Sequence, residues 1–289
     1  MNFIWDRITQ WLKELLVGGI ISNMTNLFDG INDRVSEVAV NVGATPQAWN
    51  GGIFNMVKSL SENVVVPIAG IILTIVMCLE LIQMLIDRNN MHDFDTFLFF
   101  KWIFKTFCAV MLVTNTWAIV MGVFEAAQSV VNQASGVILS DTAIDVATII
   151  TDMEDRLMAL DVGPLFGLWF QSTLMGIITW ALTISIFVIV YGRMIEIYMV
   201  TSVAPVPMAT MTNREWGQMG QNYLRSLFAL GFQGFLVMVC VGIYSVLVRN
   251  ITVDTDITKA LWTCIGYTVL LVFTLFKSSS VSKSIFNAH

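Results

Sequence analysis

Residues 194–218 read "MIEIYMVTSVAPVPMATMTNREWGQ" and determine how many times the chain can cross a membrane. The stretch begins as an apolar run and then meets two prolines, Pro205 and Pro207. A proline lacks a backbone N–H and disfavours helical geometry at the residue before it, here Ala204 and Val206. Lipid cannot satisfy the carbonyl groups left without donors, so broken backbone is tolerated at membrane depth only where protein or water covers it. The sequence therefore predicts a proline-broken, membrane-associated elbow and not a spanning helix.

The whole chain has the composition of an integral membrane protein. Of its 289 residues, 56% are hydrophobic and only 12% are charged, whereas soluble domains carry about 25% charged residues. The apolar residues form long blocks that can be compared with the roughly 20 residues needed to cross the hydrocarbon core. Five blocks qualify, at residues 64–86, 106–124, 164–191, 224–248 and 260–276. The predicted fold is an all-α polytopic membrane protein with five transmembrane helices.

The segments between these blocks are amphipathic or acidic. A stripe of apolar residues marks a helix over residues 3–16, and a weaker stripe follows over residues 31–42. The first of these helices either lies among lipid headgroups or packs on the protein's own helices. Residues 124–163 carry seven acidic side chains and one basic one, a net charge of −6. We expect a surface helix there, whose acidic face is either solvated or a docking surface.

The positions of Lys and Arg orient the chain, because these residues are enriched on the cytosolic side. With residues 194–211 outside the set of spans and the N-terminus outside the cell, eight basic residues near the spans lie inside and four lie outside. If that stretch spanned, the count would be six and six. The predicted organisation is an extracytoplasmic amphipathic region at 1–63, transmembrane helices 1 and 2 at 64–123, an acidic extracytoplasmic loop at 124–163, and transmembrane helices 3 to 5 at 164–289. The last part includes a cytosol-side broken segment at 194–222 and a short cytosolic tail.

The sequence lacks the patterns of an active site. It contains no P-loop, GxSxG or HExxH motif and only two histidines, and its four cysteines show no CxxC spacing. We therefore expect no catalytic residue, no metal, no cofactor and no enzymatic activity.

Candidate functional residues are polar or small side chains in or beside the apolar blocks. Glu80 is one, because an acid inside a membrane is a functional candidate by default. The amides Asn115 and Gln233 either line a hydrated path or bond helices to one another. Gly231 and Gly234 permit close approach of another helix. The remaining candidates surround the broken stretch and are Arg193, Glu196, Pro205, Pro207 and Trp216.

Residues 165–250 resemble the TrbL-type polytopic membrane subunit of conjugative type IV secretion systems, especially its version in integrative elements of Gram-positive bacteria. The resemblance rests on Arg193 after a span, the break at 204–209, Trp216 and the small residues around Gly231. It implies a non-enzymatic channel or scaffold subunit in the bacterial cytoplasmic membrane. It also implies a homo-oligomeric ring such as a pentamer, which works beside ATPases and other secretion subunits and helps to move DNA with its relaxase.

The acidic balance of the chain qualifies that expectation. The sequence pI is about 4.8, and basic residues that neutralise phosphates supply most of the non-specific affinity for DNA. We therefore expect transient contact with the DNA–relaxase substrate and no tight DNA binding. A small-solute transporter or ion channel is the main alternative, but the sequence shows no internal repeat and few charges at mid-membrane positions.

Overall fold

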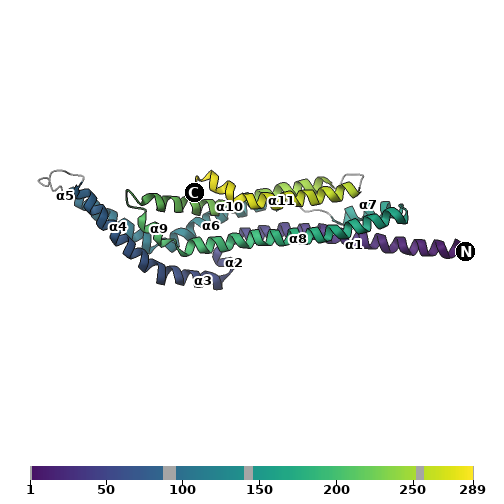
Figure 1. The fold of residues 1–289 in the computed structure, drawn as a ribbon, viewed down its shortest axis with the longest axis horizontal. Coiled ribbons are helices and arrows are strands. Elements are labelled where there is room, and N and C mark those ends of the chain that lie inside the picture. The colour runs from purple at the N-terminus through teal and green to yellow at the C-terminus, as the bar shows by residue number, and fades with distance from the viewer. Residues whose placement is uncertain (1, 87–95, 140–145, 252–256, 289) are drawn as a thin grey trace. The chain divides into compact units, whose positions relative to one another are not determined.

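Every element in the described part of the chain is a helix. The structure, a computed structural model, describes residues 2–86, 96–139, 146–251 and 257–288. In chain order the elements are α1 (Asn2–Gly43), α2 (Pro46–Trp49), α3 (Gly51–Leu60), a π-helical turn η1 (Ser61–Val65), α4 (Val66–Ile86), α5 (Thr96–Thr114), α6 (Thr116–Leu139), α7 (Val146–Met158), α8 (Val162–Ser202), α9 (Pro205–Thr210), α10 (Gly217–Ile251) and α11 (Ile257–Ile285) (Figure 1).

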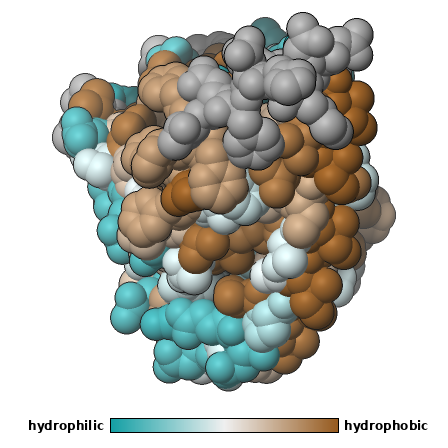
Figure 2. Space-filling model, turned by 90° about the vertical axis from the view of Figure 1, so that its left-hand side faces the viewer, coloured by the Kyte–Doolittle hydropathy of each residue, from teal (hydrophilic) through white to brown (hydrophobic). Residues whose placement is uncertain are grey.

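Five helical stretches in the described residues are long and apolar enough to cross a membrane. They are Gly51–Ile86, Phe97–Thr114, Val162–Ser202, Gly217–Asn250 and Trp262–Ile285. Large apolar side chains are exposed on them, as at Phe97, Phe100 and Phe104 of α5, and Figure 2 shows apolar side chains over much of the face it presents. Lipid can cover such side chains. The prediction of an all-α polytopic membrane protein with five transmembrane helices is confirmed.

The second spanning stretch begins earlier than the sequence suggested. We expected residues 106–124 to form one helix with Asn115 near its middle, but α5 ends before Asn115 and α6 begins after it. The Asn115 side-chain amide donates a hydrogen bond to the Met111 carbonyl at 2.9 Å. The Asn115 backbone amide also donates to the Met111 carbonyl at 3.1 Å, and the Asn115 carbonyl accepts from the Ile119 amide at 3.0 Å. The junction of α5 and α6 lies where a single span had been expected to continue.

The N-terminal region is one helix and not two. α1 continues through both predicted amphipathic segments, although it contains several glycines that weaken an isolated helix. Packing holds it together: a Cβ atom at Gly19 would lie 2.7 Å from the Trp169 indole nitrogen, and the Asn23 amide donates to the Ser172 hydroxyl at 2.9 Å. Tertiary contact with α8 therefore overrides the local propensity.

The region predicted as an acidic loop is helical for much of its length. α6 covers its first part, and α7 follows and packs against α1. In α7, Leu157 is fully buried while Glu154 and Asp155 are exposed. Asp141 and Asp145, which contributed to the predicted acidic surface, lie outside the described residues.

The chain forms two compact units. Unit 1 comprises Met1–Gly43, Asn132–Val190 and Leu236–Ser278, and unit 2 comprises Ala44–Val131, Tyr191–Phe235 and Ser279–His289. All ten predicted site residues belong to unit 2, so the site is described within that unit alone.

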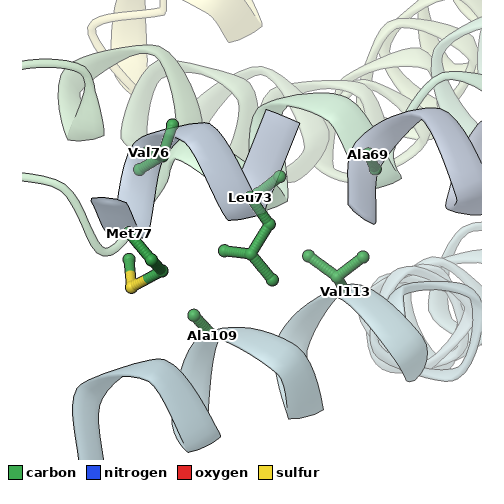
Figure 3. Packing of buried hydrophobic residues seen from close by; sticks show 7 residues of the cluster. Ala69, Leu73, Val76, Met77, Ala109 and Val113 are labelled. Carbon is green, nitrogen blue, oxygen red and sulfur yellow. The ribbon is translucent and has the colours of Figure 1, made fainter. Parts of the chain in front are cut away.

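Unit 2 contains an apolar core built from α4, α5 and α9. Its buried members are Ala69, Leu73, Val76 and Met77 of α4, Ala109 and Val113 of α5, and Ala209 of α9. Figure 3 shows the α4 and α5 side chains facing one another across this core. The short helix α9 is therefore held between two helices of its own chain.

The C-terminal residues pack on α10. α11 runs past the predicted end of the fifth span, at residue 276. The Ser282 hydroxyl donates to the Ala229 carbonyl, and the Phe286 ring lies 5.6 Å from the Phe232 ring, centroid to centroid. These contacts fix the end of the chain to unit 2.

Candidate functional site

The proline pair lies at the start of a short helix. α8 ends at Ser202, and Pro205 begins α9. We expected helical geometry to fail at Ala204 and Val206, but this was wrong: Ala204 has φ −50° and ψ −38°, and Val206 lies within α9. The reason is that both prolines occupy the first turn of α9, where a backbone N–H would have no intrahelical partner anyway.

Helix α9 lies beside the middle of α4. Ala209 packs among Leu73 and Val76 of α4 and Val113 of α5. α4 is part of a stretch that is long and apolar enough to cross a membrane. α4 and α5 thus cover the break from within the same chain.

The start of α10 closes over the other side of the break. A Cβ atom at Gly220 would lie 2.6 Å from the Pro207 carbonyl oxygen and 2.8 Å from Met211 Cβ, and one at Gly217 would lie 3.0 Å from the Met211 carbonyl oxygen. Contacts under 3.0 Å with backbone atoms cannot be relieved by a rotamer change. Glycine at position 220 is thus a condition for the close approach of α10 to α9.

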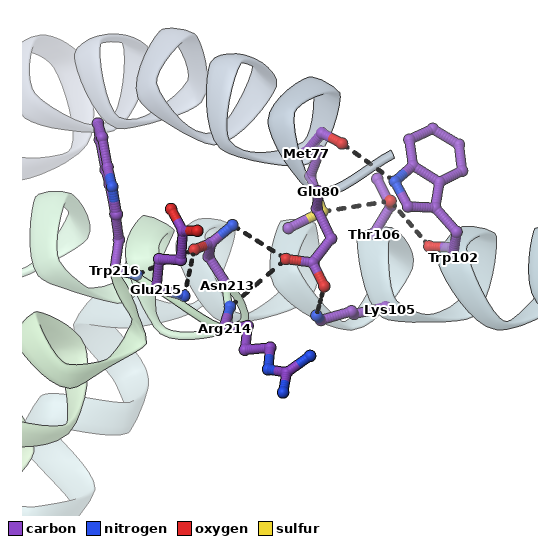
Figure 4. Close-up of polar contacts among 9 residues, drawn as sticks. All are labelled: Met77, Glu80, Trp102, Lys105, Thr106, Asn213, Arg214, Glu215 and Trp216. Atoms are coloured by element: carbon purple, nitrogen blue, oxygen red, sulfur yellow. Dashed lines mark hydrogen bonds and ion pairs between the residues drawn. The ribbon is translucent and has the colours of Figure 1, made fainter. Parts of the chain in front are cut away.

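A polar cluster, which we name the Glu80 cluster, fastens the turn that follows α9. It consists of Glu80 of α4, Lys105 of α5, Asn213, and the main chain of Arg214 (Figure 4). Glu80 Oε1 accepts a hydrogen bond from the Lys105 ammonium. Glu80 Oε2 accepts from Asn213 Nδ2 at 2.9 Å and from the Arg214 amide at 3.4 Å. One carboxylate therefore joins three segments that are far apart in the sequence.

Asn213 also starts α10. Its Oδ1 accepts hydrogen bonds from the amides of Glu215, at 2.8 Å, and Trp216, at 2.9 Å, and its carbonyl accepts from the Gly217 amide. This is how an N-cap side chain satisfies the free donors of a first helical turn. Trp216 itself is exposed, so its predicted importance is not explained by burial.

The buried charges of the Glu80 cluster, on Glu80 and Lys105, compensate each other. The Glu80 side chain is 8% exposed and that of Lys105 is 27% exposed. Removing one partner of a buried ion pair leaves an uncompensated charge, which is more destabilising than removing both. Loss of either charge therefore weakens the attachment of the turn after α9 to α4 and α5.

A second predicted group forms the crossing of α8 and α10. Arg193 is buried, and its Nη2 donates to the Leu230 carbonyl at 3.4 Å. A Cβ atom at Gly234 would lie 2.7 Å from that same Nη2, and one at Gly231 would lie 2.9 Å from Ala127 Cβ. The two glycines thus give room to a guanidinium and to helix α6, and Gln233, also buried, lies between them in the sequence.

The other two predicted residues lie outside both groups. Glu196 Oε1 accepts from the Lys283 ammonium at 3.2 Å, which ties α8 to α11. Asn115 is exposed at the α5–α6 junction and bonds its own helix. Asn115 was predicted either to line a hydrated path or to bond helices to one another. Bonding between helices does not fit these contacts.

Sequence reasoning missed several residues of the site. Lys105, which pairs with Glu80, was not among the candidates. Asn213 and Gly220 were not selected. The signal available for Asn213 was its residue type, because Asn is a preferred N-cap residue. The close approach at Gly220 had no signal in the sequence.

The described residues contain no group of three or more His, Cys, Asp or Glu side chains that could hold a metal ion. Unit 2 contains instead a helix break between α8 and α9, the helices that cover this break, and the Glu80 cluster, which attaches the turn after α9 to α4.

These features define a multi-pass α-helical membrane protein with a helix break packed inside one of its units. The chain belongs to the TrbL/VirB6 plasmid conjugal transfer-like family, which matches residues 31–205, more than half of its length. It is therefore a protein of conjugal transfer machinery. The match includes Arg193, Glu196 and Pro205 but ends before Trp216 and the glycines of α10, on which part of the resemblance was based. Comparison with curated proteins and with solved structures found no match.

Proposed function

We propose that this protein is a channel or scaffold subunit of a conjugative type IV secretion machine, without enzymatic activity of its own. In this role it helps to move a DNA–protein substrate across the cytoplasmic membrane. The observation that carries the proposal is the family match on a chain with five spanning stretches. Conjugal transfer requires a membrane passage, and a multi-pass subunit is the component able to build one.

The packed break in unit 2 supports a role in a passage. Discontinuous helices occur in membrane transporters at the sites that bind or conduct a polar cargo. Here the α9 backbone is covered by α4, α5 and the start of α10. A subunit that changes shape during transfer would do so most readily at such a break.

The proposed partners are the lipid bilayer, further copies of this chain in a ring, and the ATPases and other subunits of the machine. The DNA–relaxase substrate contacts it only transiently. Glu154 and Asp155 are exposed on α7, and acidic side chains repel phosphate groups. A passage with such a wall would release its cargo instead of holding it.

The proposed location is the cytoplasmic membrane of a bacterium, with the N-terminus outside and the C-terminus in the cytosol. This orientation rests on the distribution of Lys and Arg along the sequence. Labelling of cysteines introduced at Arg214 and Lys283 by a membrane-impermeant reagent tests it. Protection of both positions in intact cells supports the orientation, and labelling of either one contradicts it.

Deletion of the gene in a donor strain, followed by a mating assay, tests the function. We expect DNA transfer to be lost and to return when the wild-type protein is supplied from a plasmid. The alternative of a small-solute transporter or ion channel predicts unchanged transfer together with altered uptake or ion flux.

A further inference from the structure

The middle of α1 exposes a row of polar residues, which we name the polar stripe. Its positions recur every three or four residues and so share one face of the helix; they are Gly18, Ser22, Asn26, Asp29, Asp33 and Ser36. The opposite face is apolar and buried, as at Val17, Ile20 and Met24. Among the described side chains of residues 16–39, no large apolar side chain is exposed.

The other long helices of unit 1 have exposed faces of the opposite kind. α8, α10 and α11 each form part of a stretch that is long and apolar enough to cross a membrane. Within unit 1, large apolar side chains are exposed on all three helices, and they include Phe170, Ile243 and Phe273. Exposed apolar surface of this extent is typical of a face in contact with lipid. α1 differs from these helices although it belongs to the same unit.

Hydrogen bonds fix the register of α1 against α8. The Asn23 amide donates to the Ser172 hydroxyl at 2.9 Å and to the Thr173 hydroxyl at 3.3 Å. One turn earlier in each helix, Gly19 of α1 meets Trp169 of α8. The two helices therefore run parallel and side by side (Figure 1). Residues of α1 lie level with residues 149 or 150 positions later in α8.

This register, continued by one to two turns, brings polar and apolar exposed residues to the same level. Asn26 comes level with Ile177, and Asp29 comes level with Trp180, to within about two residues. Ile177 is 62% exposed and Trp180 is 65% exposed. A medium that suits the α8 side chains at this level is therefore unsuited to those of α1.

Neither lipid nor a protein partner suits the polar stripe. A carboxylate in hydrocarbon is costly, and acids at membrane depth face a bundle interior or a water-filled cavity. Protein interfaces are depleted in Asp and Ser and rely on large aromatic or arginine side chains as anchors. The stripe contains Asp29, Asp33 and two serines and no such anchor. Water, by contrast, satisfies hydroxyl, amide and carboxylate groups alike.

We propose that the polar stripe of α1 lines a water-filled path at the depth at which α8 faces lipid. Part of the region 1–63, which we predicted to be extracytoplasmic, then lies within the membrane. The path does not depend on the conjugal transfer role, because it would serve a transporter or an ion channel equally well. A mating assay tests that role, and hydration of the stripe is tested separately.

Collisions of spin labels with two relaxing reagents test the hydration and the depth of the stripe together. A cysteine that carries a nitroxide replaces Asn26 or Asp29 on α1, or Ile177 or Trp180 on α8. The full-length protein is reconstituted in liposomes, with its native cysteines replaced by alanine. Oxygen concentrates in hydrocarbon, whereas nickel ethylenediaminediacetate stays in water. We expect collisions mainly with the nickel complex at positions 26 and 29 and mainly with oxygen at positions 177 and 180.

Three outcomes of this experiment would overturn the proposal. Nickel collisions that dominate at all four positions would place this part of unit 1 outside the bilayer. Oxygen collisions that dominate at all four would place α1 in lipid. Few collisions with either reagent at positions 26 and 29 would show that protein covers the stripe. A label at Ala39, which is buried, is the control for covered positions.

Alkylation in native membranes repeats the test without purification. N-ethylmaleimide crosses membranes but reacts with the thiolate form of cysteine, which forms in water. We expect rapid alkylation of Asn26→Cys and Asp29→Cys and slow alkylation of Ile177→Cys and Trp180→Cys. Equal rates at the four positions, or slow alkylation at positions 26 and 29, would contradict a water-filled path along α1.

Discussion

The side-chain amide of Asn213 donates a hydrogen bond to Glu80 Oε2 at 2.9 Å and so attaches the turn after α9 to α4. The same carboxylate pairs with Lys105 through its other oxygen. α9 itself carries Ala209 into the apolar core between α4 and α5. A helix break is thus enclosed by apolar contacts along its length and by a polar fastener at its end.

Loss of the Glu80 charge should loosen this fastener. Glu80→Gln leaves the partly buried Lys105 without its counter-charge, and we expect a loss of about 1–3 kcal/mol in stability, visible as a lower melting temperature in detergent. Adding Lys105→Met to Glu80→Gln removes the unpaired charge and should recover part of the loss. A double variant no more stable than Glu80→Gln alone would contradict the pairing.

Asn213→Asp should open the turn after α9. The substitution places a second carboxylate against Glu80 Oε2 and removes a hydrogen-bond donor, so the two groups repel. Amide hydrogen exchange over residues 203–216 measures the effect, and we expect faster exchange there than in the wild-type protein. The exposed Glu215→Gln serves as the control and should leave exchange unchanged. Equal exchange in the two variants would contradict a fastening role for Asn213.

Gly220→Ala should be destabilising because the new methyl group meets the Pro207 carbonyl oxygen at 2.6 Å. Forced overpacking of this kind is destabilising by roughly 1–3 kcal/mol. Gly176→Ala in α8 is the matched control, since no atom lies within 4 Å of a Cβ there and alanine is the better helix former. Melting temperatures compare the two. A drop for Gly176→Ala as large as that for Gly220→Ala would refute the close approach of α10 to α9.

Gly234→Ala should be coupled to Arg193. The added Cβ lies 2.7 Å from Arg193 Nη2, the far end of a flexible side chain, so the guanidinium can move at a moderate energetic cost. We expect a smaller loss than for Gly220→Ala and a coupling free energy with Arg193→Met of about 0.5–2 kcal/mol in a double-mutant cycle. Additive effects of the two substitutions would indicate that the guanidinium does not occupy this space.

The fold class followed from the sequence because apolar blocks of spanning length are a local property. The limits of the second span were wrong because Lys101 and Lys105 lower the hydropathy at its start, and only the fold reveals that Glu80 neutralises Lys105. In the same way, two separate apolar stripes suggested two N-terminal helices, whereas contact of Gly19 with Trp169 supports one. Such pairings join residues far apart in the chain, and hydropathy alone does not report them.

The surroundings of the proline pair likewise depend on contacts that the local sequence does not report. The sequence predicted a break, and one lies at residues 203–204, between α8 and α9. The helical geometry that follows depends on Pro205 and Pro207 sharing one first turn. The burial of α9 depends on the packing of Ala209 with Val113 and on the absence of a side chain at Gly220. A broken segment with the same local sequence could be packed in many other ways.

The mating frequency of a deletion strain, complemented in turn with wild-type protein, Glu80→Gln and Gly176→Ala, tests the central claim most directly. Membrane levels of the three proteins are matched by immunoblot. We expect no transfer without the protein, full transfer with the wild type and with Gly176→Ala, and fewer transconjugants with Glu80→Gln. Wild-type transfer in the deletion strain would contradict the conjugal role, and full transfer with Glu80→Gln would contradict the role of the fastened break.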